Sequence, residues 1–302
     1  MTTFAVLAHR EPLLLSRLVE RLAPHDVVVH VDGKSRARDF RLATEHCGPR
    51  VRFVPDPSRV SVNWAGFSML RATMAAYREA LRSTHDGEHI VLLSGQDYPI
   101  KPLHEFQQHL QNAPHRQHIR MFQITPALGK YYRHLAGLYN QDLHLPGRLD
   151  HPQARRVLMR LLRDTTGRMD RKAPEGTIFT FGSQWVALTR ECVQWIVEGF
   201  PTSPVARYTA RSFAPDEKTI HSMVANSPYA KEMPGGAPQR FIGEGTYRMA
   251  NFHEIDPSLN KIFTLSDLGR LSASDKFFVR KVSLENSSPL LDAIDATLVA
   301  TH

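Results

Sequence analysis

The first part of the chain combines two kinds of hydrophobic pattern. Residues 2–8 (TTFAVLA) and 26–32 (DVVVHVD) are apolar runs of strand length. Residues 12–23 (PLLLSRLVERLA), which lie between them, carry apolar side chains at helical spacing. A strand, a helix and a strand within about 30 residues indicate a βαβ unit, whose two strands run parallel in one sheet.

Three further segments extend this pattern. Residues 51–56 predict a third strand, and residues 89–94 (HIVLLS) predict a buried fourth strand that stops at a Ser-Gly turn. Residues 66–83 predict a helix, because Leu70, Met74, Tyr77 and Leu81 fall on one face. Alternating strands and helices of this kind predict an α/β fold.

The second part of the chain is less regular. The basic segment 148–172 contains an amphipathic helix, which we interpret as packing its apolar side on the core. It could instead bind an acceptor or a membrane surface. Residues 177–200 predict a strand, a turn and a helix, residues 214–228 a helix with an acidic first turn, and the residues after Pro289 a last helix. No boundary is visible, so we expect one domain over residues 1–302.

Composition excludes several classes of protein. Apolar residues make up 42% of the chain, and no apolar run approaches the ~18 residues that cross a bilayer. Two cysteines are too few for a disulfide framework or a structural zinc site. The first residues lack a basic leader before their apolar run, so we expect no signal peptide and a cytoplasmic location.

The charge of the chain is strongly basic. The formal net charge is +8, and 29 arginines stand against 9 lysines. Such an excess suits nucleic acid, an anionic membrane surface or a phosphorylated small molecule, or it serves only solubility. The sequence has no Walker loop, no GxGxxG after the first strand, no GxSxG, no HExxH and no Asp-x-Asp.

The fourth predicted strand delivers polar residues to its carboxyl end. Ser94, Gly95 and Asp97 follow it directly in LLSGQDYPI. In open α/β sheets, ligands bind beyond the carboxyl ends of the strands. This segment is therefore the first candidate for a binding site.

Six segments together resemble one enzyme family: HVDGKS (30–35), VNWAGFSMLRATM (62–74), LLSGQDYPIKP (92–102), GSQWVALTRE (182–191), APDEKTIHSMVANSP (214–228) and FVRKV (278–282). Between Thr3 and about Val282 the chain resembles the core-2/I-branching β-1,6-N-acetylglucosaminyltransferases and the related peptide O-xylosyltransferases. The resemblance implies a GT-A type glycosyltransferase fold, a single α/β/α domain with a Rossmann-like nucleotide-binding half. The nucleotide sugar would bind to about residues 1–110, and about residues 111–302 would bind the acceptor and catalyse transfer.

The activity that this resemblance implies is an inverting, metal-independent glycosyl transfer. A sugar, GlcNAc or xylose, would move from a UDP-sugar to an acceptor hydroxyl, with no cofactor and no divalent metal. The missing Asp-x-Asp agrees, because that tripeptide usually holds the metal on the diphosphate. Without a metal, fixed cations must stabilise the charge that grows on the leaving group.

The resemblance also assigns residues. Glu217 matches the general base, and Arg248 and Lys281, with Arg280 adjacent, match the cations at the UDP leaving group. The donor would further contact the residues His9, Asp32, Ser94, Gly95 and Asp97. The sugar and acceptor would lie against the residues Trp64, Gly182, Ser183, Gln184 and Trp185. Arg280 and Lys281 could also be only an edge-strand charge pair, and Glu217 could serve only to cap a helix.

The substrates stay open at this point. The acceptor could be a glycan, a natural product, a lipid-linked saccharide or a peptide. Ala65 replaces a glycine that is common in the family, and Gln184 replaces the aspartate of the xylosyltransferases, so the donor sugar is not fixed. The absence of an anchor and of disulfides suggests a stand-alone bacterial form of these enzymes.

Three alternative functions compete with this interpretation. The chain could be a metal-dependent glycosyltransferase that uses a carboxylate pair without a recognisable motif. It could be an Arg-rich nucleic-acid-binding protein, although its arginines are not interleaved with aromatic residues, and we expect no nucleic-acid partner. It could bind a nucleotide sugar without turnover, against which Glu217 argues.

Overall fold

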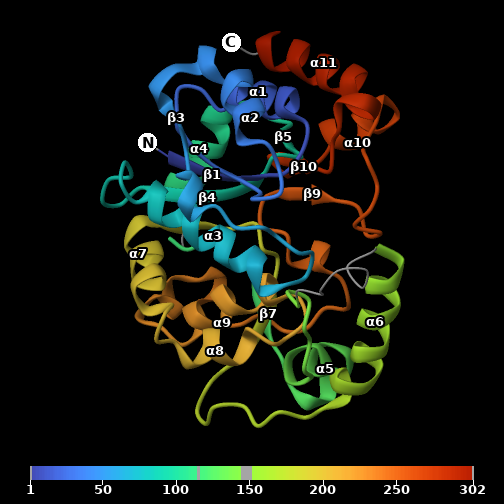
Figure 1. The fold of residues 1–302 in the computed structure, drawn as a ribbon. Coiled ribbons are helices and arrows are strands. Elements are labelled where there is room, and N and C mark those ends of the chain that lie inside the picture. Colours follow the sequence, from blue (N-terminus) through green and yellow to red (C-terminus); the bar gives the residue numbers. More distant parts are fainter. Residues whose placement is uncertain (1, 114–115, 144–151, 301–302) are drawn as a thin grey trace.

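The centre of the fold is a mostly parallel β-sheet (Figure 1). The structure, a computed structural model, describes residues 2–113, 116–143 and 152–300. The sheet has the order β3-β2-β1-β4-β8, in which the first four strands are parallel and β8 is antiparallel to β4. Its strands are β1 (Thr2–Ala8), β2 (Asp26–Val31), β3 (Val51–Phe53), β4 (His89–Ser94) and β8 (Ala187–Thr189).

Helices cover both faces of this sheet, which is why its central strands are apolar on both sides. One face packs on α1 (Pro12–Arg21), α2 (Ala37–Ala43) and α4 (Leu103–Asn112). The other face packs on α3 (Phe67–Ala80) and α7 (Arg190–Gly199). The hydrophobic cluster on the α3 and α7 face joins segments far apart in the sequence, because it contains residues from Ala5 in β1 to Met249.

A second sheet joins the end of the chain to the end of β4. It contains β5 (Asp97–Pro99), β10 (Phe278–Arg280) and β9 (His253–Ile255), in the order β5-β10-β9. The antiparallel pairing of β5 and β10 sets Asp97 opposite Arg280. The last helix, α11 (Leu284–Ala300), is tied to α1, where Arg17 Nη2 donates to Asp292 and Asp295, both at 2.7 Å.

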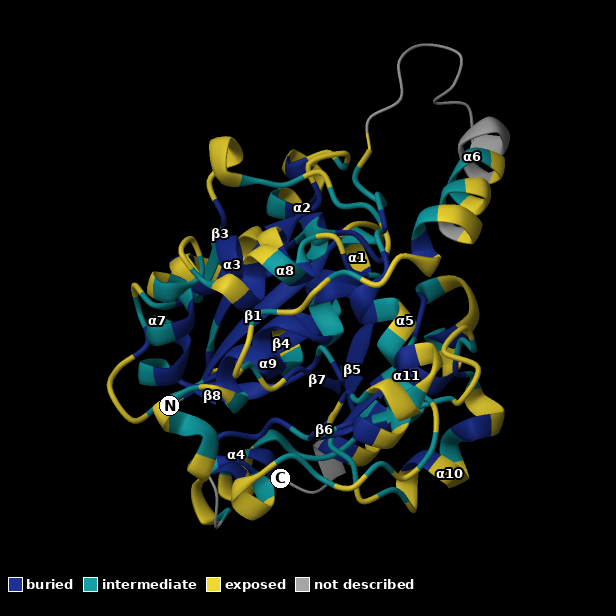
Figure 2. Cartoon of the chain, turned by 90° about the horizontal axis from the view of Figure 1, so that it is seen from below, coloured by how far each residue is buried: buried dark blue, intermediate teal, exposed yellow. Residues whose placement is uncertain are grey.

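The remaining elements form the lower part of Figure 1 and one edge of the molecule, except α10, which lies beside α11 in the upper part. They are β6 (Met121–Gln123), β7 (Thr180–Gly182), α5 (Lys130–Ala136), α6 (Pro152–Thr165), α8 (Pro204–Thr209), α9 (Thr219–Ala225) and α10 (Leu268–Ser272). Figure 2 shows α6 at the edge of the molecule, with much of its described surface exposed. None of the described helices is long and apolar enough to cross a membrane.

The α/β class and the Rossmann-like half are confirmed by the order and direction of β1 to β4. The prediction that the basic segment packs its apolar side on the core is wrong for part of it. Val157 and Leu161 are 60% and 58% exposed, because the described part of α6 has the body of the protein on one side only. Residues 148–151 of that segment lie outside the described residues.

Two predicted helices begin elsewhere. The segment 214–228 starts with a single 3₁₀ turn, Pro215–Glu217, and α9 begins only at Thr219, because Lys218 between them has a non-helical backbone (φ −132°). The last helix begins at Leu284 rather than after Pro289. Ser283 precedes it, and its hydroxyl accepts the N–H of Asn286 at 3.3 Å, which supplies the start signal.

Candidate active site

A cavity of about 900 Å³ lies beyond the carboxyl ends of the parallel strands. Polar residues that follow three of the strands open into it: His9 and Arg10 after β1, Asp32 after β2, and Gln96 after β4. The opposite wall comes from the second half of the chain, including Gln184 and the Asp216–Glu217 turn. This is the place where open α/β sheets bind their ligands.

One end of the cavity is rich in positive charge. Arg10, Lys34, Arg280 and Lys281 all line it. Burial lowers the pKa of Lys281, and the neighbouring Arg280 and Arg10 lower it further. No described residue pairs with the Arg10 guanidinium or the Lys281 ammonium through a hydrogen bond or ion pair. Unpaired cations that repel one another favour an anionic ligand.

The buried carboxylate of Asp97 holds the Arg280 guanidinium in place. Arg280 Nη1 donates to Asp97 Oδ1 at 2.8 Å, and its guanidinium lies 4.3 Å from the centre of the Trp185 ring. Asp97 is completely buried and also accepts from the Ser94 N–H at 2.7 Å and contacts His253 Nε2 at 3.0 Å. Burial raises the pKa of Asp97, but Arg280 and His253 outweigh burial, so its pKa lies below the ordinary value.

Asp97, which was predicted to line the donor cleft, therefore does not line this cavity. The pairing of β5 with β10 turns its carboxylate under Arg280, away from the cavity. Gly95 is also absent from the cavity wall, because its α-carbon packs against Ala8, where an added Cβ would lie 3.3 Å from the Ala8 Cβ. Ser94 lines the cavity as expected.

Asp32 lies at the end of β2 with one carboxylate oxygen committed to the backbone. Its Oδ1 accepts the N–H groups of Lys34 at 2.9 Å and Val62 at 3.2 Å. The residue is 8% exposed and lines the cavity. These bonds fix the carboxylate, so its second oxygen is presented to a ligand in a defined position.

His30, beneath Asp32 in β2, is a buried neutral histidine. Its Nε2 accepts the Val60 N–H at 3.0 Å, and burial lowers its pKa to about 4. At pH values between the ordinary pKa of 6.5 and about 4, His30 is protonated in the unfolded state and neutral in the folded state. Stability is therefore expected to fall by roughly 3 kcal/mol through this side chain as the pH falls through that window.

Denaturant unfolding at neutral pH and near pH 4 measures this effect. His30→Gln keeps a hydrogen-bond acceptor but cannot take up a proton, so its stability should depend less on pH. His46→Gln changes an exposed histidine and should follow the wild type. An unchanged pH dependence in His30→Gln would show that other groups cause the loss.

Two carboxylates face the cavity from the 3₁₀ turn, Asp216 and Glu217. Thr246 Oγ1 donates to Glu217 Oε1 at 2.9 Å. Burial raises the pKa of Glu217, with Lys218 and Thr246 opposing the rise, and burial and the charge of Glu217 raise the pKa of Asp216. Among the described residues, no backbone N–H at a helix start donates to the Glu217 side chain, so helix capping does not account for it. Its raised pKa suits a general base near neutral pH.

Aromatic rings form the outer rim of the cavity. Trp64 is 77% exposed, and its ring centre lies 5.6 Å from that of Phe213 in an edge-to-face arrangement. Phe213 also packs on His134 at 4.7 Å. Trp64, Phe213 and His134 all line the cavity. An exposed indole face held by a packed neighbour offers a flat apolar surface to a ring-shaped ligand.

Two alanines with left-handed backbones connect this rim to the carboxylate turn. Ala65 (φ 57°) and Ala214 (φ 47°) both line the cavity, and the Ala214 N–H donates to the Ala65 carbonyl oxygen at 3.1 Å. Positive φ is strained for alanine and persists where the surroundings fix it, often beside a functional site.

Three other predicted residues do not reach the cavity wall. Gly182 and Ser183 pack behind it, where a Cβ at Gly182 would lie 2.3 Å from the Arg120 carbonyl oxygen and the Ser183 carbonyl accepts from His221 Nε2 at 3.0 Å. Arg248 is exposed and bonds the Glu244 carbonyl oxygen at 3.0 Å through Nε, so it does not line the cavity. Gln184 and Trp185 do line it.

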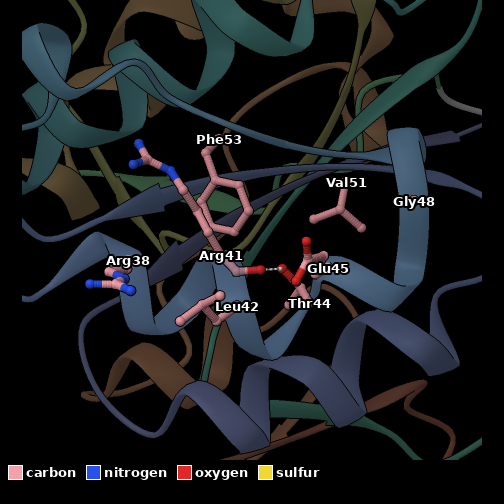
Figure 3. Close-up of a pocket in the computed structure, with 8 residues that line it drawn as sticks. All are labelled: Arg38, Arg41, Leu42, Thr44, Glu45, Gly48, Val51 and Phe53. Carbon is pink, nitrogen blue, oxygen red and sulfur yellow. Dashed lines mark hydrogen bonds between the residues drawn. The ribbon is translucent and has the colours of Figure 1, made fainter.

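A second hollow of about 280 Å³ lies elsewhere, between α2 and β3 (Figure 3). It contains none of the predicted site residues. Its walls include Arg38, Arg41 and Phe53. Among the described residues, no group of three or more His, Cys, Asp or Glu side chains is placed to hold a metal ion.

Comparison with known proteins gives a family and several distant relatives. The model of the family described as "Core-2/I-Branching enzyme" matches residues 2–235. A xylosyltransferase of Ciona intestinalis is 24% identical over 212 residues, which are 67% of this chain and 22% of that protein. Human xylosyltransferase 1 is 23% identical over 225 residues, which are 69% of this chain and 20% of that protein. The chain thus spans about a fifth of the length of these relatives.

A solved structure of mouse xyloside xylosyltransferase 1, in its apo form, is among the similar structures. It has a TM-score of 0.33 and 13% sequence identity, and the alignment covers 78% of this chain and 85% of that chain.

Proposed function

The chain belongs to the core-2/I-branching enzyme family, a family of glycosyltransferases, and we propose that it transfers a sugar from a UDP-sugar to an acceptor hydroxyl. The observation that carries the proposal is that a buried carboxylate and a group of cations line one cavity. Glu217 lines it together with Arg10 and Lys281, which no described residue pairs, and with Arg280, which Asp97 holds in place. GlcNAc and xylose are the proposed donor sugars, and the names of the relatives favour xylose.

In the proposed reaction the acceptor oxygen attacks the anomeric carbon on the face opposite the diphosphate. Glu217 takes the proton of the acceptor hydroxyl, the bond from the anomeric carbon to the diphosphate oxygen breaks, and UDP leaves with the electron pair. The configuration inverts, so an α-linked donor yields a β-glycoside. A single carboxylate is sufficient for this displacement.

The leaving group needs positive charge as the bond breaks. Arg280 and Lys281 supply it in the proposal, together with Arg10, the second residue after β1. One cation about 4 Å from the growing charge is worth on the order of 4 kcal/mol at an effective dielectric near 20, before desolvation is subtracted. Two or three such groups can do the work that a divalent metal does in other enzymes.

Asp32 is proposed to bind the nucleoside. Its backbone bonds hold one oxygen in place, and the other is free to accept a hydroxyl of the ribose or an N–H of the base. Trp64 and Gln184 are proposed to contact the sugar or the acceptor from the opposite wall.

Release of UDP from a panel of nucleotide sugars tests the proposed function. We expect one UDP-sugar to bind, to shift the melting temperature and to release UDP in the presence of excess EDTA. Activity that disappears in EDTA and returns with Mn²⁺ would favour the metal-dependent alternative. Binding of nucleic acid that weakens steeply with salt, without affinity for any nucleotide sugar, would overturn the proposal.

Removing single cations should weaken UDP binding. We expect Arg10→Ala and Lys281→Ala each to raise the calorimetric Kd for UDP about tenfold or more, since each removes a charged contact to phosphate. Arg248→Ala serves as the contrast, because that side chain does not line the cavity, and it should leave the Kd unchanged. An Arg10 or Lys281 variant with wild-type affinity would remove that residue from the phosphate site.

A further inference from the structure

Lys218, directly after Glu217, is a lysine with no exposed surface. Its Nζ donates to the carbonyl oxygens of Phe213 at 2.7 Å and Ala214 at 3.2 Å, and it lies 5.2 Å from the centre of the Phe181 ring. Lysine is almost never fully buried unless it is paired with a carboxylate. No carboxylate in the described part of the chain lies within ion-pair distance of this ammonium, so its burial needs another explanation.

The backbone contacts of Lys218 fix the turn that carries the proposed base. Ala214 has a left-handed backbone, and its N–H donates to the Ala65 carbonyl oxygen. Its own carbonyl oxygen accepts from the Lys218 ammonium and from the Glu217 N–H, both at 3.2 Å. The next residues of the turn, Asp216 and Glu217, line the cavity. Without the ammonium, the strained turn would lose its only charged contact and would be held at Ala214 by backbone hydrogen bonds alone, among the described residues.

The charges at this place do not balance without Lys218. Two carboxylates, Asp216 and Glu217, adjoin one buried ammonium. Asp216 Oδ1 is buried and has no hydrogen-bond partner among the described residues. One positive charge can compensate one of the two carboxylates, and in a region of low dielectric that compensation acts beyond contact distance. Without the ammonium, the two carboxylates would not both be ionised, and one of them would keep a proton.

The other groups around Glu217 cannot replace this charge. Lys130 of α5 also lowers the pKa of Glu217, but its ammonium is paired with Glu244 at 3.4 Å. Tyr131, also in α5, is neutral, because burial raises its pKa. Thr246 contributes a hydrogen bond without charge. His221 of α9 lies near Lys218 and is neutral, because burial lowers its pKa to about 3.

We propose that Lys218 is a positioning residue of the transfer reaction: its ammonium holds the left-handed turn that directs Glu217 into the cavity, and it keeps the Glu217 carboxylate ionised. This inference rests on the proposed function, with Glu217 as the base.

The pH dependence of turnover in Lys218→Met tests the inference. The assay is UDP release from UDP-xylose or UDP-GlcNAc with water as the acceptor, so that water attacks the anomeric carbon and Glu217 takes its proton. We expect turnover at neutral pH to fall about 10–100-fold, the acid limb of kcat to move upward by about one pH unit or more, and KM for the donor to change less than about threefold. Activity should recover partly at high pH.

Lys101→Met is the matched control. Lys101 also lies over an aromatic ring, 5.4 Å from the centre of Phe277, but it does not line the cavity, and its pH profile should match the wild type. A loss of activity in Lys218→Met that is equal at every pH would overturn the role of the charge. An unchanged rate would overturn both roles.

A second variant covers the case in which Lys218→Met does not fold. Asp216→Asn removes the competing carboxylate and leaves Lys218 to compensate Glu217 alone, so the acid limb should move to lower pH. A limb that does not move in this variant contradicts the charge coupling. A wild-type protein that releases no UDP from any nucleotide sugar contradicts the proposed function instead, so the two failures can be told apart.

Discussion

Replacing Glu217 with glutamine is expected to leave UDP binding intact and to lower turnover by about 10²–10⁴-fold. Glutamine has nearly the same shape and can still accept the hydroxyl of Thr246, so the turn should keep its structure. It cannot take the proton of the acceptor hydroxyl, which is the step assigned to this side chain. Calorimetry with UDP and a UDP-release assay measure the two effects separately.

The matched control for this variant is Glu198→Gln, which makes the same chemical change at an exposed position of α7 and should keep full activity. Asp216→Asn identifies which of the two neighbouring carboxylates is the base. A Glu217→Gln enzyme with a near-normal rate, together with an inactive Asp216→Asn enzyme, would transfer the role to Asp216. In the wild type, turnover should fall as the pH falls through the raised pKa of Glu217, because protonation removes the base.

Replacing Asp97 with asparagine is expected to cost about 3–5 kcal/mol of folding stability, the usual penalty when one partner of a buried ion pair is removed. The variant leaves Arg280 and His253 facing an uncharged amide in a completely buried place. Because the pKa of Asp97 is lowered in the folded state, its contribution is present above the ordinary value of 3.8 and is lost as the pH falls through the folded value. Denaturant unfolding at neutral pH measures the full effect.

The same variant should weaken UDP binding without touching the cavity wall. Asp97 holds the guanidinium that is proposed to meet the diphosphate, so a freed Arg280 should bind UDP less tightly. Asp86→Asn removes an exposed partner of Arg190 and should change neither quantity. Wild-type stability and UDP affinity in Asp97→Asn would show that the carboxylate does not anchor Arg280.

The Rossmann-like half could be predicted from the sequence because its signals are local. The apolar runs of β1, β2 and β4 and the amphipathic face of α3 each lie within a short window. The same locality places Asp32 correctly, since a residue directly after a parallel strand must lie at the carboxyl edge of the sheet.

Asp97 shows where local reasoning fails. It follows β4 just as Asp32 follows β2, but its direction is set by a strand partner 183 positions later in the chain. No periodicity in the sequence predicts the pairing of β5 with β10. The resemblance assigns Arg248 within a segment without regular structure. The path of that segment depends on Gly243 and Gly245, whose positive φ values the sequence does not reveal.

Two functional candidates were missed although the sequence contained a signal for each. Arg10 is the second residue after the first strand, in the loop from which backbone and side chains reach a phosphate in many α/β folds. Lys218 stands beside the predicted base, and a cation next to a catalytic carboxylate changes its ionisation. The place of Arg10 on the cavity wall and the complete burial of Lys218, on which the two proposals rest, appear only in three dimensions.

The meeting of β5 and β10 has a consequence for how the protein matures on the ribosome. The five-stranded sheet is complete once residue 189 has emerged, whereas Arg280 and Lys281 emerge only later, with and after β10. A nascent chain that ends between β8 and β10 would thus possess the nucleoside pocket and Arg10 yet lack Arg280 and Lys281 at the proposed diphosphate end. The proposed leaving-group site would be complete only after β10 has been synthesised and has paired with β5.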